Sequence, residues 1–367
     1  MKKNILFLLG TLLLATACNT EPQKADPVSK SASKPKNIIL MIGDGLGVSQ
    51  LYAAYSIKKD QLNIARCRHA ALVNTSSIDD LITDSAASGT AMSTGTKTRN
   101  GHIAVDTNGK SLTTILEFAE LHNKATGLVS TSSITHATPA SFIAHNPNRN
   151  DYEGIATDFL KTDIEVFIGG GLDHFNKRED GRKLTEQLAE KGYDVKKEPA
   201  GIKNYNGRKL AGLVYGKHGP KVSEGRKTFL EDATETSLNI LSKDTNGFFL
   251  MIEAAQIDWG GHDMDSEYVV QETLDFDNAV GKALDFAEKN GETLVIVTSD
   301  HETGGMTVIE GGLDGKNMVY HFSTDHHTPV FVPLLASGPG SENFTGIMEN
   351  TAIFDKMMQA FGFNNPK

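Results

Sequence analysis

Residues 37–45, with the sequence NIILMIGDG, decide the fold. The apolar, β-rich run 37–42 predicts a strand, and it stops at an acid set between two glycines, Gly43-Asp44-Gly45. In a parallel sheet the ligand site gathers beyond the carboxyl ends of the strands. Asp44 is therefore a candidate site residue, and other strands that end in the same way are candidates to join it.

The same kind of strand recurs along the chain and alternates with stretches of helical periodicity. This alternation is typical of a mostly parallel sheet covered by helices on both faces. We therefore predict an α/β fold, a three-layer α/β/α sandwich with a central, mostly parallel sheet. The predicted strands are 37–42, 126–130, 164–168, 248–252, 293–298 and 330–335, and the predicted helices are 112–122, 151–160, 182–191, 228–241 and 267–290.

Composition excludes several classes of protein. The chain has 367 residues, 39% hydrophobic and 22% charged, which argues against a disordered chain, a coiled coil or a multi-span membrane protein. A net charge of -10 argues against a nucleic-acid partner, which needs a basic face. Two cysteines make no disulfide framework. After residue 36 the sequence contains no internal repeat and no linker rich in Pro or Gly that would divide it, so we expect one catalytic domain over residues 37–367.

The N-terminus predicts export. Lys2 and Lys3 precede an apolar segment, 5–17, that is too short to span a membrane. Leu14-Ala15-Thr16-Ala17-Cys18 resembles a bacterial lipoprotein box, so we expect a signal peptide over 1–17 and a lipid anchor on Cys18. Plain cleavage that discards Cys18 is the alternative. Residues 18–36 are rich in Pro, Ser and Lys and predict a flexible tether. The protein is then periplasmic or anchored to the outer membrane, and only the anchor contacts lipid.

Several predicted strands end at acids and imidazoles. A single Asp after a strand is usually a turn former. Here separate segments of the chain supply seven carboxylate and imidazole groups. This combination of ligands suits zinc, and it includes enough carboxylate oxygens to bind magnesium as well. These residues are Asp44, Glu253, Asp258, His262, Asp300, His301 and His327.

Ser85 is the candidate nucleophile. It stands in Asp84-Ser85-Ala86-Ala87-Ser88 at a predicted helix start, where backbone N–H groups favour an anion. A plain helix cap is the alternative. The Gly-x-Ser-x-Gly elbow of serine hydrolases is absent, so activation by a metal is the favoured chemistry.

Taken together and in order, the motifs resemble those of the alkaline phosphatase family. The resemblance covers residues 37–339 and rests on six segments: Gly43-Asp44-Gly45, Asp84-Ser85-Ala86, His136-Ala137-Thr138, Glu253 with Asp258 and His262, Asp300-His301, and His327-Thr328. It implies hydrolysis of small phosphate monoesters through a phosphoserine formed on Ser85. It also implies that Arg149 grips the phosphate and that the protein forms a homodimer.

The resemblance further implies two zinc ions and one magnesium ion. Asp258, His262 and His327 would hold one zinc, and Asp44, Asp300 and His301 the other. Asp44, Thr138 and Glu253 would hold the magnesium. His136 and Trp259 stand where some members have aspartate and lysine, and loss of that carboxylate should weaken magnesium binding at the third site. A helix cap is the alternative role for His136, and a cover over an apolar wall is the alternative for Trp259.

Two rival functions share this core. A phosphodiesterase of the same superfamily uses a hydroxyl nucleophile and the same metal ligands, but such relatives generally lack the set of Thr138 and Glu253. A sulfatase is disfavoured because no Cys or Ser lies in a Cys/Ser-x-Pro-x-Arg context. The rival from another class is a lipoprotein that binds metal or phosphate without catalysis, which would need neither Ser85 nor Arg149.

Overall fold

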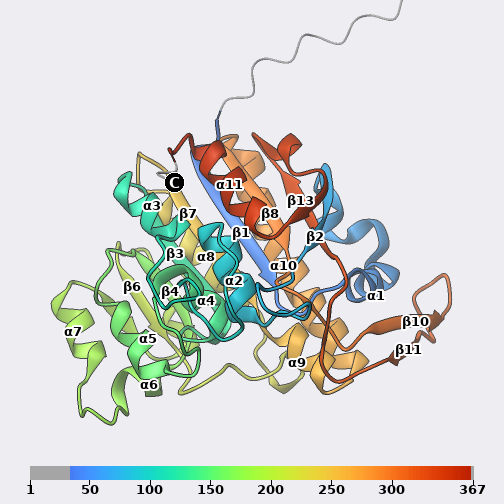
Figure 1. Cartoon of the computed structure of the whole chain (residues 1–367), viewed down its shortest axis with the longest axis horizontal. Coiled ribbons are helices and arrows are strands. Elements are labelled where there is room, and N and C mark those ends of the chain that lie inside the picture. The colour runs from blue at the N-terminus through green and yellow to red at the C-terminus, as the bar shows by residue number, and fades with distance from the viewer. Residues whose placement is uncertain (1–33, 365–367) are drawn as a thin grey trace, which may run out of the picture. The chain divides into compact units, whose positions relative to one another are not determined.

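Strand β1 (Asn37–Gly43) lies inside the central sheet, parallel to both of its neighbours. The computed structural model describes residues 34–364. In it, β1 pairs with β7 (Phe248–Ala254) on one side and with β8 (Thr293–Thr298) on the other. The three strands run in the same direction (Figure 1). Asp44, Glu253 and Asp300 lie at or just beyond the carboxyl ends of these strands and therefore at the same edge of the sheet.

The described residues contain a ten-stranded sheet in the order β14-β2-β13-β8-β1-β7-β3-β4-β6-β5. Only β13 runs antiparallel to its neighbours β8 and β2, and the prediction of a mostly parallel sheet is confirmed. Because β13 is reversed, its beginning lies where the parallel strands end. The remaining strands are β14 (Gly346–Glu349), β2 (His69–Asn74), β13 (Val332–Ser337), β3 (Ala125–Ser133), β4 (Val166–Gly170), β6 (Leu210–Leu213) and β5 (Asp194–Lys196).

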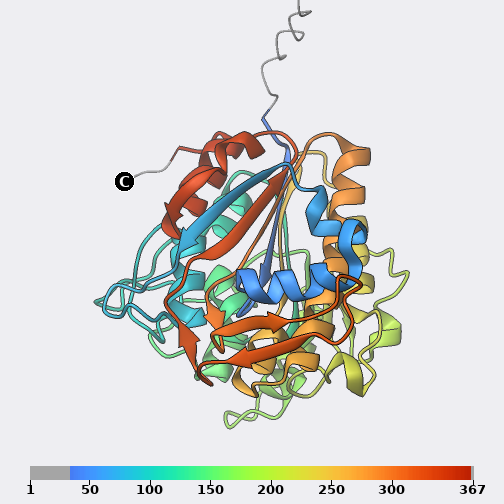
Figure 2. The same ribbon diagram turned by 90° about the vertical axis from the view of Figure 1, so that its right-hand side faces the viewer.

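Alternate residues of β1 enter two different hydrophobic cores. Ile38 and Leu40 belong to one core and Ile39 and Met41 to the other, so the strand is buried on both faces. Figure 2 shows helices on opposite sides of the strands, which makes the three layers. One core contains α2 (Ser85–Thr94), α3 (Ile115–Leu121), α4 (Ala137–Ile143), α5 (Tyr152–Asp158), α6 (Leu172–Asn176), α7 (Leu184–Glu190) and α11 (Thr351–Phe361); the other contains α1 (Val48–Lys58), α8 (Phe229–Leu241), α9 (Gln256–His262) and α10 (Ser266–Asn290).

The segment between His301 and His327 is short and makes only local structure. β9 (Glu302–Thr303) pairs antiparallel with β12 (His327–Thr328), and between them β10 (Met306–Glu310) and β11 (Val319–Phe322) form a two-stranded ribbon (Figure 1). The β9–β12 pairing brings the two histidine-bearing segments together. Through this pairing, the chain that leaves β8 is tied to the segment just before β13.

The predicted signal peptide, Cys18 and most of the tether lie outside the described residues. Within residues 34–364, no helix combines the length and the apolar character that a membrane crossing requires. The long helix α10 buries one face against the sheet and carries charged residues on the other.

Candidate active site

The first cluster of metal-ligating groups joins α9 to β12. The Nε2 atom of His262 lies 3.4 Å from Oδ1 of Asp258, and Nε2 of His327 lies 3.5 Å from the same oxygen. The Nδ1–H of His262 donates to the carbonyl of Asp325 (2.6 Å), and that of His327 donates to the carbonyl of Thr83 (2.8 Å). Carbonyls only accept, so each Nε2 presents a lone pair to the cluster.

The second cluster surrounds His301. Its Nε2 lies 3.3 Å from Oδ2 of Asp300 and 3.5 Å from Oδ1 of Asp44. Its Nδ1 lies 3.2 Å from Oγ1 of Thr303, whose hydroxyl donates to Asp258. The Thr303 oxygen therefore accepts from His301 Nδ1, and Nε2 again faces the cluster as a lone pair.

The third cluster lies between β7 and α4. Asp44, His136 and Glu253 each place one ligand atom within 4.8 Å of the others. His136 is the N-cap of α4, but its side chain makes no cap hydrogen bond, so its ring is free for this cluster. Trp259 and His218 lie edge-on to the His136 ring, at 6.3 and 5.6 Å between centroids.

Several buried polar atoms in these clusters have no hydrogen-bond partner among the described residues. They are both carboxylate oxygens of Asp44, Oδ2 of Asp300, Oε1 of Glu253 and Nδ1 of His136. Leaving such groups unpaired in a protein interior is costly, and a cation among the carboxylates removes that cost. The donor set therefore fits metal ions.

Burial raises the pKa of the carboxylates in these clusters and lowers the pKa of the imidazoles, so in both cases it favours the neutral form. Burial and then the neighbouring carboxylates of Asp300 and Asp258 hold the pKa of Asp44 well above its ordinary value. Burial also raises the pKa of Glu253 to about 7, against the hydroxyls of Ser130 and Thr138, which lower it. Burial lowers the pKa of His301 and of His136 well below the usual range, so both imidazoles are neutral and able to bind a metal.

Ser85 is the first residue of α2, and its Oγ lies 3.3 Å from Nε2 of His301. Asp84 caps the helix by accepting from the backbone N–H of Ala87 (2.9 Å). The other oxygen of Asp84 accepts from Gly101 N (2.9 Å) and from Arg149 (2.8 Å). One carboxylate thus fixes both the helix start and the guanidinium, so Arg149 is held beside the start of α2.

The family model for alkaline phosphatases matches residues 35–323 of the chain. This chain is a member of the alkaline phosphatase family. The phosphatase is 37% identical over 309 residues to alkaline phosphatase 4 of Bacillus subtilis, covering 80% of the chain and 67% of the relative. It is 32% identical over 412 residues to the Escherichia coli alkaline phosphatase, and the match covers 91% of this chain and 88% of the relative.

A solved structure carries the same fold. The alkaline phosphatase of the Antarctic bacterium TAB5 superimposes with a TM-score of 0.85 at 41% identity, over 90% of this chain and 99% of the other. The chain is therefore a phosphatase, and its sheet and covering helices are those of its family.

The structure brings every predicted ligand of the phosphatase to one edge of the sheet. Thr138 lies in α4 close to Glu253. Trp259 packs on two imidazoles instead of an apolar wall.

Sequence reasoning missed Ser130 and Ser132, which donate to Glu253, and Thr303. The run of hydroxyl residues Ser130-Thr131-Ser132-Ser133, at the end of a predicted strand, could have indicated the two serines.

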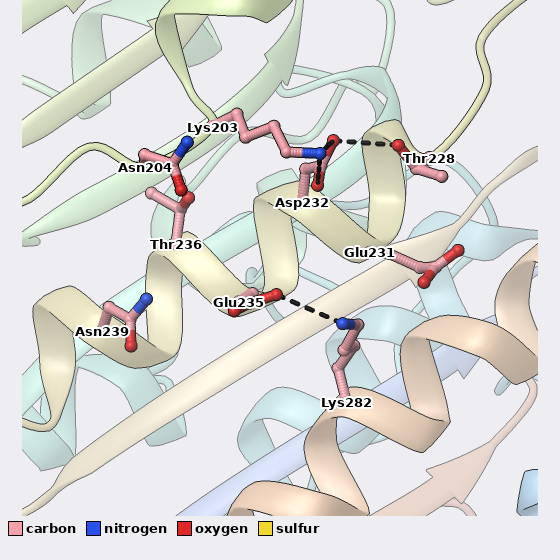
Figure 3. Close-up of a pocket in the computed structure, with 9 residues that line it drawn as sticks. All are labelled: Lys203, Asn204, Thr228, Glu231, Asp232, Glu235, Thr236, Asn239 and Lys282. Carbon is pink, nitrogen blue, oxygen red and sulfur yellow. Dashed lines mark hydrogen bonds and ion pairs between the residues drawn. The ribbon is translucent and has the colours of Figure 1, made fainter.

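A second pocket, of about 250 Å³, lies away from these clusters, between the segment of Lys203 and Asn204 and helices α8 and α10 (Figure 3). Both of its lysines are in ion pairs: Lys203 lies 3.1 Å from Asp232, and Lys282 lies 3.3 Å from Glu235. It shares no residue with the active site.

Proposed function

We propose that this phosphatase hydrolyses phosphate monoesters through a phosphoserine on Ser85, at a site that holds two zinc ions and one magnesium ion. One observation carries the proposal. The Ser85 hydroxyl stands at the start of a helix, 3.3 Å from Nε2 of His301, in a site where both oxygens of Asp44 and one oxygen each of Asp300 and Glu253 have no hydrogen-bond partner among the described residues.

In the proposed reaction the oxygen of Ser85 attacks phosphorus and the bond to the substrate's alcohol oxygen breaks. Water then attacks the phosphoserine, inorganic phosphate leaves and the serine hydroxyl is restored. Arg149 suits the transferring phosphoryl group because its planar fork matches two oxygens. Asp84 holds that guanidinium in place, and the backbone N–H groups of α2 add positive potential.

The three clusters fit the three proposed ions. Asp258, His262 and His327 would hold one zinc, and Asp44, Asp300 and His301 the second, since both sets combine imidazole with carboxylate. Asp44, Thr138 and Glu253 offer only oxygen and fit magnesium. When bound, such ions neutralise charge on the phosphoryl group and favour the deprotonated form of a nearby hydroxyl.

The test compares p-nitrophenyl phosphate with bis-(p-nitrophenyl) phosphate in the presence of zinc and magnesium. We expect faster hydrolysis of the monoester. A higher kcat/KM for the diester would instead support the phosphodiesterase, and hydrolysis of neither would support a non-catalytic binding protein. Ser85 beside His301, with Arg149 bound to the neighbouring Asp84, counts against a non-catalytic binding protein, because pure metal binding needs neither Ser85 nor Arg149.

The third site gives a separate prediction. A variant of the TAB5 enzyme with a histidine replaced by aspartate has magnesium bound in its M3 site. We propose that His136 is the corresponding position, since its ring offers one nitrogen to the third cluster and its buried Nδ1 has no hydrogen-bond partner among the described residues. Aspartate adds a hard oxygen ligand, so His136→Asp should lower the magnesium concentration for half-maximal activity about tenfold.

A magnesium titration of both forms measures this, and His218→Asp serves as the matched control because His218 contacts the same rings but no ligand cluster includes it. An unchanged or weaker magnesium response of His136→Asp would remove His136 from the metal site.

We also propose that the protein is exported and anchored through a lipid on Cys18. The support is the sequence of residues 1–18, and Asp44 is the first site residue, so the anchor precedes the whole catalytic domain. Cys18→Ser should leave the activity of the catalytic domain intact and release it from membranes. Fractionation decides the point: unchanged membrane association of the variant would contradict the anchor.

A further inference from the structure

Glu302 is a buried carboxylate for which the proposed mechanism has no role. It follows the ligand His301 and is only 3% exposed. Among residues 34–364, no lysine or arginine forms an ion pair with it. Burying a carboxylate without a counter-charge costs free energy unless hydrogen bonds compensate for it. The groups that donate hydrogen bonds to Glu302 therefore indicate which segments it holds in place.

Four donors converge on the Glu302 carboxylate. The side-chain amide of Gln50 (2.6 Å) and the backbone N–H of Met306 (3.2 Å) donate to Oε1. The hydroxyl of Thr328 and the backbone N–H of Gly305 (3.2 Å) donate to Oε2. Both oxygens are saturated, and the donors come from α1, from the β9–β10 turn and from β12.

Gln50 adds a second link between α1 and β9. Its amide also donates to the carbonyl of Thr303 (2.9 Å), so it uses both of its hydrogens on this segment. The approach of α1 is close: a Cβ at Gly47 would lie 2.4 Å from Cγ of Glu302. Glu302 is therefore packed closely against α1 and held by Gln50, as a positioning group requires.

The link that matters for the site is the one to Thr328. β9 and β12 pair through only two residue pairs, His327 with Thr303 and Thr328 with Glu302. So short a ladder fixes the strands weakly by itself. The hydrogen bond from Thr328 to Glu302 adds a side-chain tie at the residue next to His327, whose ring stacks on that of His301 at 3.6 Å between centroids.

We propose that Glu302 is a positioning residue that acts through Thr328 to hold the imidazole of His327 ready for metal. The inference rests on the proposed metal-dependent function. Glu302 would not touch substrate or metal. It would fix the segment that supplies one of the three ligands of the first cluster, Asp258, His262 and His327.

The experiment measures zinc affinity by competition with a chelator on the full folded protein. Glu302→Gln keeps the shape but turns one acceptor oxygen into an amide donor that faces donors. Loss of a hydrogen-bond partner of a metal ligand typically weakens metal binding 10- to 100-fold, and the lower end of that range applies to Glu302, which acts one residue further out, through Thr328. We expect about that loss for one zinc of the two, with the affinity of the other changed less.

Thr328 gives the matched pair of variants. Thr328→Val removes the hydroxyl and keeps the shape, and we expect it to weaken the same zinc. Thr328→Ser keeps the hydroxyl and should restore affinity to near the wild-type value. If Glu302 acts through Thr328, the double variant Glu302→Gln/Thr328→Val should lose less than the product of the two single losses. This pair also decides the question if Glu302→Gln does not fold.

Glu310→Gln is the control, because Glu310 is an exposed carboxylate on the same ribbon. Wild-type zinc affinity in folded Glu302→Gln, or equal affinities of Thr328→Val and Thr328→Ser, would overturn the inference while leaving the proposed function intact. Failure of the wild-type protein to bind zinc would instead overturn the proposed function and this inference with it.

Discussion

Ser85→Ala should lose nearly all turnover, at least about 1000-fold in kcat, and keep its metal content. The hydroxyl is the only group of the chain that the proposed reaction joins covalently to phosphorus. It is one of several groups around His301, so the carboxylates and imidazoles that would hold the metals remain. Steady-state kinetics on p-nitrophenyl phosphate, with metal analysis of the same preparation, measures both quantities.

Ser93→Ala is the matched control for this variant. Ser93 lies in the same helix and is also buried, but its hydroxyl donates to the carbonyl of Ser141 (2.6 Å), away from the clusters. We expect this variant to retain most of the wild-type activity. Wild-type activity in Ser85→Ala would show that Ser85 is not the nucleophile.

Metal removal should abolish activity and also destabilise the fold. Without cations the buried carboxylates of Asp44, Asp300 and Glu253 lie close together with several of their oxygens lacking a hydrogen-bond partner, and burial raises the pKa of each. Prolonged incubation with a strong chelator should lower both activity and the midpoint of thermal unfolding. Adding zinc and magnesium together should restore activity better than either ion alone, because the clusters are of two kinds.

The stabilisation by metal should grow with pH. Glu253 has a pKa of about 7 in the metal-free fold against an ordinary value of 4.5. A group with a raised pKa stabilises the fold fully below its unfolded value and loses that contribution as pH rises through the folded value. The metal-free protein should therefore lose stability between about pH 4.5 and 7.

Bound metal contributes about 2.7 kcal/mol when its concentration is 100 times the dissociation constant. Thermal unfolding with and without zinc and magnesium, at pH 5 and pH 8, measures the difference. Full activity after chelation, or equal stabilisation by metal at both pH values, would contradict this scheme.

The strands that carry the site were predictable because each is an apolar run that ends in a chemically distinctive residue. All six predicted strands are present, with β4 and β13 beginning two residues later than predicted. Helix α2 was visible only at its start. All of its residues are buried and most are small, so it has no polar face to reveal its period. Its helical form depends on burial against α4 and α11.

The partners of the ligands were less predictable than the ligands. Ser130, Thr303 and Glu302 are ordinary strand residues in the sequence. Strand pairing brings Ser130 to Glu253 and Glu302 to Thr328, and packing of β9 against α9 brings Thr303 to Asp258. Strand β2, which lies between β14 and β13, also escaped prediction, since it is short and only Ala71 and Val73 of its six residues are buried.

The central place of β1 has a consequence for how the chain folds. The first strand to be synthesised pairs on both sides with strands more than half the chain away, Ile38 with Phe249 and with Leu294. Pairing over such separations is slow, because the loop must close before any contact stabilises it. The apolar segment 37–43 therefore waits without partners until late in synthesis, and we expect it to be the segment of the nascent chain most in need of a chaperone.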